Sequence, residues 1–368
     1  MKYRIRCEYR KITSRQGGRE VTNIYKCPAC GAPIEFDSES GKMSCDYCAS
    51  SFDVSQIDTQ YKKYENKVYD ETPVEKEYCS FDGYMCNSCG AEVATDENTA
   101  ATFCSFCGSP TLIRGRLTGA LKPELVIPFK IKKEEAVAAY KKWTGKGIIT
   151  PSCFRKESTI QKITGMYVPF WLYDYDAQGY VTATGTRTSK SRSGDTVTVR
   201  TAHYQIGRNV ESKYELIPAD ASEKMDDKTM DLLEPFNYDE LRPFEMPYLS
   251  GYFAEKYTYK AEDMKNRIEN RVRDYVNDEA RSTMIGYQTL NILSSNLNLT
   301  RKRASYALMP VWILNYQYKG KNYSFNMNGQ TGRIVGKLPK SMAKIAALFS
   351  GVTAASALIF ALLGGLFG

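Results

Sequence analysis

The stretch CPACGAPIEFDSESGKMSCDYC, residues 27–48, decides how the first part of this chain folds. Between its two cysteine pairs, Ile34 and Phe36 alternate with Glu35 before the turn-forming run 38–41, which predicts a β-hairpin. Such a hairpin brings the second pair of sulfurs opposite the first, as the four ligands of a zinc ribbon require. The predicted ligands are Cys27, Cys30, Cys45 and Cys48.

The same pattern returns 59 residues later as CNSCGAEVATDENTAATFCSFC, residues 86–107. The repetition predicts two self-contained ribbons, while a cross-braced pair that shares ligands between the copies is the alternative. Four thiolates per ion leave no open coordination position, so we expect two structural Zn²⁺ ions per chain rather than catalytic ones. The ligands of the second ribbon are predicted to be Cys86, Cys89, Cys104 and Cys107.

The bulk composition is that of a folded protein, with 42% hydrophobic residues among 368 and a high content of tyrosine that favours a β-rich body. Two tetrathiolate centres, each of charge −2, reduce the formal net charge of +8 to about +4, a weak argument for nucleic acid. Residues 1–6 contain no apolar run, so we expect a reducing compartment in which paired cysteines bind metal. The unpaired Cys7, Cys79 and Cys153 are predicted to be small core residues.

Beyond the ribbons, the hydrophobic periodicity predicts a β-rich α+β domain. Two motifs in it, Pro169-Phe170-Trp171 with Gly179 and Pro310-Val311-Trp312 with Gly320, predict two related hairpins, each with a core tryptophan and a glycine at the turn. The expected elements are a helix at 132–143, a strand at 166–175, a hairpin of 180–187 and 196–204 with a polar loop at 189–195, a helix at 261–280, strands at 306–318 and 321–326, and a turn at 328–332.

The segment Ile345–Gly368 contains no charged residue. As a helix it is about 36 Å long, enough to cross a hydrocarbon core of about 30 Å. Basic residues precede it, so the positive-inside rule predicts a single-pass protein of the cell membrane with a cytoplasmic N-terminal body. A buried core helix is the alternative. The preceding basic residues are Arg333, Lys337, Lys340 and Lys344.

Residues that suit catalysis are few, and we expect no enzyme. The single histidine, His203, lies in a Thr/Val-rich strand, and no GxxxxGK[ST] loop is present to bind phosphate. Asp174 and Asp176 lie on one side of a strand and are the one candidate acid/base pair.

Nucleic-acid binding is the competing function, because zinc ribbons often serve it. The basic edge of residues 2–11, with Arg114, Arg116 and Lys122 beyond the second ribbon, offers phosphate contacts. Acidic residues inside the ribbons oppose it, and the basic edge suits anionic lipid equally well. Those acidic residues are Glu35, Asp37, Glu39, Asp46, Glu92, Asp96 and Glu97.

Several short motifs are distributed along the chain from its first cysteine pair onward. They are Cys27-Pro28-Ala29-Cys30-Gly31-Ala32, the second ribbon, Ile127-Pro128-Phe129, Tyr167-Val168-Pro169-Phe170-Trp171, Tyr248-Leu249-Ser250-Gly251-Tyr252, Pro310-Val311-Trp312, Asn328-Gly329-Gln330-Thr331-Gly332 and the hydrophobic end. In these motifs the chain resembles the TFIIB-type double zinc-ribbon membrane proteins of Gram-positive bacteria. The resemblance implies a membrane anchor that recruits a phage-shock-type peripheral membrane protein, an SPFH (flotillin-like) protein and a TPM-domain protein.

Together these inferences predict a zinc-binding membrane scaffold that acts through protein–protein interaction in membrane stress or membrane organisation. The alternative is a membrane-tethered nucleic-acid-binding regulator. The predicted domains are a basic β-hairpin (1–25), ribbon 1 (26–52), a linker or helix (53–84), ribbon 2 (85–118), the α+β domain (123–340) and a transmembrane helix (345–368).

Overall fold

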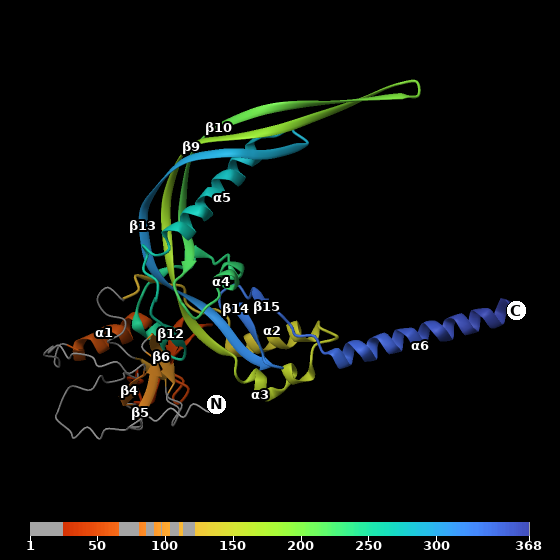
Figure 1. Cartoon of the computed structure of the whole chain (residues 1–368). Helices are drawn as coiled ribbons and strands as arrows, with labels where there is room; N and C mark the ends of the chain where they lie inside the picture. Colours follow the sequence, from red (N-terminus) through yellow and green to blue (C-terminus); the bar gives the residue numbers. More distant parts are fainter. Residues whose placement is uncertain are drawn as a thin grey trace, which may run out of the picture.

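A computed structural model of the chain describes residues 25–65, 81–85, 92–96, 98–103, 110–112 and 122–367. Within them the protein is α+β, with a β-rich body and one apolar C-terminal helix, as expected (Figure 1). The basic hairpin predicted before residue 25 lies outside the described residues. The helices are α1 (Val54–Glu65), α2 (Lys133–Gly145), α3 (Glu157–Ile160), α4 (Asp227–Leu233), α5 (Lys265–Thr283) and α6 (Met342–Phe367), with 3₁₀ turns at Ser152–Arg155, Tyr238–Glu240 and Met246–Leu249.

The strands fall into one large sheet and two small ones. The large sheet has the order β11-β8-β13-β9-β12-β6-β7, with β10 also on β9, β14 on β13 and β15 on β14. The strands are β1 (Glu35–Asp37), β2 (Lys42–Ser44), β3 (Ser51–Phe52), β4 (Phe81–Met85), β5 (Glu92–Asp96), β6 (Thr99–Phe103), β7 (Pro110–Leu112), β8 (Leu125–Val126), β9 (Thr164–Ser193), β10 (Thr196–Asp220), β11 (Arg242–Pro243), β12 (Phe253–Glu255), β13 (Thr289–Tyr318), β14 (Lys321–Asn328) and β15 (Ile334–Gly336).

Three very long antiparallel strands, β9, β10 and β13, form the frame of the body (Figure 1). Their lower halves are apolar on both faces: along β13, Leu308 and Trp312 join the core beside α2, while Met309 and Val311 join the core beside α4. This strict alternation places a layer on each side of the sheet and explains why residues 306–314 read as a continuous hydrophobic run.

The upper halves of the long strands form a curved arm with α5 against one face (Figure 1). Helix α5 buries Ile268, Val272, Val276 and Ala280, which are spaced four residues apart and therefore share one face. They pack on residues of β9 that include Tyr173 and Tyr175. The predicted helix at 261–280 is confirmed, as is the one at 132–143, which corresponds to α2.

The arm differs from the sequence-based expectation of separate strands joined by a polar loop at 189–195. Strand β9 runs unbroken to Ser193, and the turn contains just Gly194 and Asp195. Gly179 is likewise inside β9, although we predicted it at a turn; a Cβ there would lie 2.1 Å from the backbone oxygen of Asn296 on β13. Glycine is needed at this position because two backbones approach closely. The second predicted hairpin is confirmed, with Gly320 at the turn between β13 and β14 and Trp312 buried.

Ribbon 1 forms the expected hairpin, in which β1 pairs with β2 and β2 with β3. The second copy repeats part of it in register: Met43 pairs with Phe52, and 59 residues on Thr102 pairs with Thr111. The copies differ elsewhere, because β5 pairs with β4, while β6 joins the large sheet through β12. The predicted linker at 53–84 begins as the helix α1 and ends in strand β4, which starts at Phe81; residues 66–80 lie outside the described residues.

Candidate metal centre

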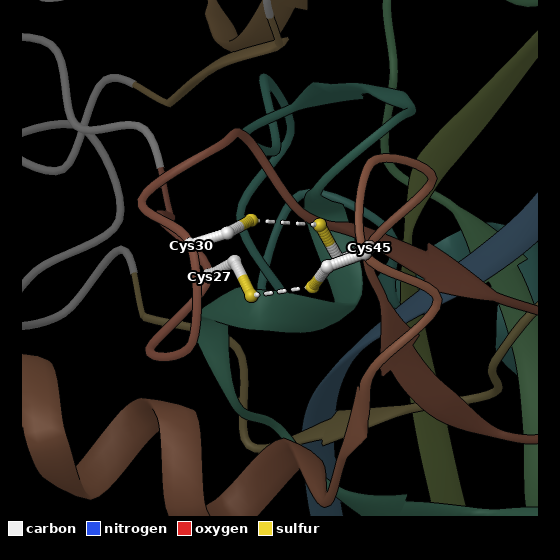
Figure 2. Close-up of side chains that lie close together, drawn as sticks. Cys27, Cys30 and Cys45 are labelled. Atoms are coloured by element: carbon white, nitrogen blue, oxygen red, sulfur yellow. Dashed lines mark hydrogen bonds between the residues drawn. The ribbon is translucent and has the colours of Figure 1, made fainter.

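The four cysteines of ribbon 1 converge on one point. Cys27 and Cys30 come from the turn before β1, and Cys45 comes from the facing turn after β2 (Figure 2). All four Sγ atoms lie within 4.8 Å of one another, and the pairs Cys27–Cys48 and Cys30–Cys45 are each 3.6 Å apart. The structure therefore brings together all four predicted ligands of the first ribbon.

Two turns of the same design hold the thiols. The N–H of Cys27 donates to the Ala32 carbonyl at 2.7 Å, and the N–H of Gly31 donates back to Cys27 at 2.8 Å. The second turn repeats both bonds 18 residues on, with Cys45 and Ala49 in the places of Cys27 and Gly31 at 3.0 and 2.8 Å. This pseudo-symmetry presents one pair of sulfurs from each side, as a tetrahedral ion requires.

The sulfur spacing suits zinc. A regular tetrahedron with Zn–S bonds of about 2.3 Å has S···S edges of about 3.8 Å. The two 3.6 Å pairs are close to that value. Four cysteine sulfurs are also the soft donor set that structural zinc prefers. The arrangement is thus compatible with a zinc ribbon of closed coordination.

The electrostatics of the thiols also favour a cation. Hydrogen bonding with the side chain and the backbone of Ser50 lowers the pKa of Cys48 to about 6. The backbone N–H of Ala32 lowers the pKa of Cys30, but desolvation and the neighbouring thiols raise it to about 12. Repulsion between neighbouring thiolates therefore opposes joint ionisation, and a bound dication relieves it.

Ribbon 1 is docked on the body rather than held away from it. The Ser250 hydroxyl donates to the Ile34 carbonyl at 2.8 Å, and the Phe36 N–H donates to the Ser250 carbonyl at 3.2 Å. The rings of Phe36 and Tyr248 meet edge to face with centroids 5.2 Å apart. Ile34 and Phe36 are buried in the same core cluster as Tyr248, so the ribbon shares its small core with the large domain.

A second contact joins the ribbon to α2. Lys132, at the N-terminal end of α2, forms ion pairs with Asp37 at 3.5 Å and with Glu39 in the ribbon turn. A cleft of about 450 Å³ remains between these elements, lined by Glu35, Lys132, Tyr252 and Trp312 among others. Desolvation in this cleft, with the nearby charge of Asp46, raises the pKa of Glu35.

The other cysteines and the single histidine that the sequence analysis singled out lie away from this centre or outside the described residues. The cysteines of the second ribbon, with Cys7 and Cys79, lie outside the described residues. Cys153 is half-buried in a 3₁₀ turn, and His203 is exposed on β10 opposite Thr186. His203 is therefore the polar strand residue that we expected, whereas Cys153 is less buried than the core position predicted for it.

Asp174 and Asp176 lie on the same side of β9, as expected, and each has its own partner. Asp174 accepts a hydrogen bond from the N–H of Leu216 at 2.9 Å, where β10 forms a bulge. Asp176 pairs with Lys302 at 3.1 Å. The structure therefore gives both carboxylates a role in strand packing.

The residues that sequence reasoning missed are those that fasten the ribbon and α5. The motif around Ser250 was noticed, but nothing in it indicated that it would contact a segment 216 residues earlier. Arg267 on α5 was also missed; it contacts the buried Asp220 at 2.9 Å and Asp231 at 2.7 Å. Desolvation raises the pKa of Asp220 to about 6 even beside Arg267.

Helix α6 is the remaining candidate feature. Within it the stretch Met342–Phe360 is long and apolar enough to cross a membrane, with a mean hydropathy of 1.7, and none of it is buried in the protein. Figure 1 shows α6 leading away from the body. Length and composition alone identify this candidate span.

Fold and site together define an α+β protein with a four-cysteine cluster compatible with a zinc ribbon and with one candidate membrane helix. The chain is similar to the uncharacterized protein YdjG of Bacillus subtilis (strain 168), with 39% identity over 328 residues that cover 89% of this chain and 93% of YdjG. It belongs to the same family as YdjG. No family model matches the chain, and no solved structure matches it.

Proposed function

We propose that this protein is a membrane-anchored adaptor that holds cytoplasmic partner proteins at the membrane. The observation that carries the proposal is α6. Its exposed apolar side chains spread over about 200° of the helix circumference, and the described body offers no core to cover them. Those side chains include Leu348, Phe349, Val352, Leu358, Ile359 and Phe360.

The metal centre supports an adaptor rather than a zinc-dependent catalyst. Four thiolates close the coordination sphere, so the ion in ribbon 1 would stabilise a docking head without binding substrate. The shared core and the contacts of Ser250 and Lys132 fix that head on the body. We extend the proposal to a second zinc ion on Cys86, Cys89, Cys104 and Cys107, since their spacing repeats that of ribbon 1.

The resemblance to the double zinc-ribbon membrane proteins suggests the partners. They would be a phage-shock-type peripheral membrane protein, an SPFH protein and a TPM-domain protein, acting in membrane stress or membrane organisation. The docking surface we favour is the cleft between ribbon 1 and α2, where Lys133 and Glu134 are exposed beside aromatic side chains. Acidic residues around it, such as Glu39, disfavour nucleic acid as the partner.

Affinity purification of the full chain from detergent-solubilised membranes, followed by identification of bound proteins, tests the proposal. A chain that lacks residues 345–368 should no longer be found in the membrane fraction, and its partners should move to the cytoplasm. An unrelated single-span helix in the same place should restore the membrane location of the chain and of its partners. Exchange of two charges in the cleft, Lys133→Glu with Glu134→Lys, should weaken partner binding while the chain stays in the membrane. Partners that remain at the membrane without 345–368 would refute the adaptor, and retention of DNA or RNA would favour the competing function.

A further inference from the structure

The far end of the curved arm extends beyond the third strand, β13, and beyond α5, which pack against the rest of the arm. The third strand, β13, begins at Thr289, opposite Thr186 of β9. The preceding residue, Gln288, still binds the backbone of Thr188 through its side-chain amide. From there to the end of the hairpin, residues 189–200 form a two-stranded ribbon, which we name the arm tip, and every residue in it is exposed.

A two-stranded ribbon has little stability of its own in water, so an arm tip that extends this far suggests a surface that it contacts. The register of β9 and β10 shows what the tip presents. Val197 lies directly opposite Arg192, and Val199 lies directly opposite Lys190. Directly opposed residues of an antiparallel pair share a face, so one face carries two valines on β10 beside two cations on β9.

Both valines are more than half exposed, Val197 at 55% and Val199 at 53%. The opposite face of the tip carries hydroxyl residues, such as Ser191 opposite Thr198, and also the third cation of the tip, Arg200, which lies opposite Ser189. Three cations and one acid, Asp195, give the tip a net positive charge. The tip thus combines short apolar side chains and basic side chains on a single face, as in segments that bind membrane interfaces.

The direction of the arm gives the second observation. In Figure 1 the arm bends over the body, and its tip projects toward the same side as α6. A body anchored through α6 with its positive flank on the cytoplasmic side therefore directs the tip toward the leaflet that α6 enters. That leaflet carries anionic headgroups.

We propose that the arm tip binds the anionic headgroup layer of the membrane that α6 enters. Lys190 and Arg192 contact lipid phosphates, while Val197 and Val199 enter the boundary between headgroups and acyl chains. A nucleic-acid groove fits this face less well, because it would leave the valines against polar groups. The inference rests on the proposed membrane anchoring and adds a second contact that sets the orientation of the body above the bilayer.

Hydrogen exchange tests the contact on the full chain. The chain is reconstituted in nanodiscs of phosphatidylcholine alone and in nanodiscs that contain phosphatidylglycerol, and amide exchange of residues 189–200 is compared. We expect about tenfold slower exchange with the anionic lipid, since each basic residue near such a surface contributes several-fold to binding. The double variants K190E/R192E and V197S/V199S should each reduce that difference. The matched variant T196S/T198S, which alters the opposite face, should keep it.

The possible outcomes distinguish the lipid contact of the arm tip from the anchoring of the chain through α6. Incorporation into both discs with equal exchange of the tip would overturn the lipid contact alone. Slower exchange that persists in K190E/R192E would overturn it as well, as would protection by duplex DNA but not by anionic discs. Failure of the chain to enter either disc would overturn the anchor and the tip contact together.

Discussion

The two turns that hold the four cysteines of ribbon 1 differ at one equivalent position, and the difference has a measurable consequence. Gly31 and Ala49 both have left-handed backbones, with φ of 78° and 56°. An L-residue pays about 1–2 kcal/mol for that conformation, whereas glycine pays about 0.5–1 kcal/mol for its greater freedom in the unfolded chain. Ala49→Gly should therefore stabilise the ribbon by about 0.5–1 kcal/mol, and Gly31→Ala should destabilise it by about as much.

Sterics do not complicate this comparison, because a Cβ added at Gly31 meets no atom within 4 Å. Zinc binding and folding are coupled in small ribbons, so the free-energy change should appear as a change in zinc affinity of about 2–5-fold. The assay is competition with a chromogenic chelator. It uses a chain with Cys104 and Cys107 replaced by serine, so that ribbon 1 titrates alone.

Gly41 provides the matched control for the two turn variants. It lies in the turn between β1 and β2 with φ of 66° and open space around its Cβ position. Gly41→Ala should weaken zinc binding about as much as Gly31→Ala, since both changes impose the same conformational cost. The double variant Gly31→Ala/Ala49→Gly should return to the wild-type affinity. Weaker or unchanged zinc binding by Ala49→Gly would refute the reasoning.

Three further predictions concern the ligands, the ion-pair network and the arm. Cys45→Ser should reduce the zinc content from about two ions per chain to about one, measured by elemental analysis; loss of both ions would favour the cross-braced arrangement. Arg267→Leu should destabilise the protein by about 3–5 kcal/mol near neutral pH, because Asp220 is left buried without its partner. The pKa of Asp220 then rises further, so the native state keeps a proton that the unfolded chain releases. The difference in free energy of unfolding between wild type and variant, measured by urea unfolding, should therefore be smaller at about pH 6 than at about pH 8. A difference that does not depend on pH would contradict this assignment. Gly179→Ala should cost about 1–3 kcal/mol in the same assay by forcing β9 from the backbone of Asn296; an unchanged unfolding midpoint would show that the strands separate freely.

The elements that sequence analysis predicted well are those with a strong local signal. The ribbon hairpin follows from the two cysteine pairs and from the alternation of Ile34 and Phe36, and both appear in the structure. Helix α5 follows from apolar residues such as Ile268 and Val272 at helical spacing. In each case the residues that decide the element lie within one or two turns or one hairpin of each other.

The arm was predicted less well, because what distinguishes it lies outside local sequence. Residues 189–195 are polar on both faces, and polarity alone favours a loop over an exposed strand. What extends β9 to Ser193 is pairing with β10, whose partner residues lie across the turn at Gly194. Gly179 resembled a turn residue in the sequence. The reason that it must be glycine is the close approach of the β13 backbone, which lies more than a hundred residues away in the chain.

The docking of ribbon 1 on the body could not be predicted from local sequence for the same reason. It bears on the role that we propose for the metal centre. A ribbon on a flexible linker could search for a partner independently of the membrane. Ribbon 1 instead shares its core with Tyr248 and accepts the Ser250 hydrogen bond, while Lys132 fixes its turn against α2. Helix α6 follows the same sheet, so its position relative to the ribbon is set by the body. Under the proposed anchoring through α6, a zinc ion in ribbon 1 would stabilise a surface at a defined height and orientation above the bilayer, and we therefore favour an adaptor over a mobile nucleic-acid reader.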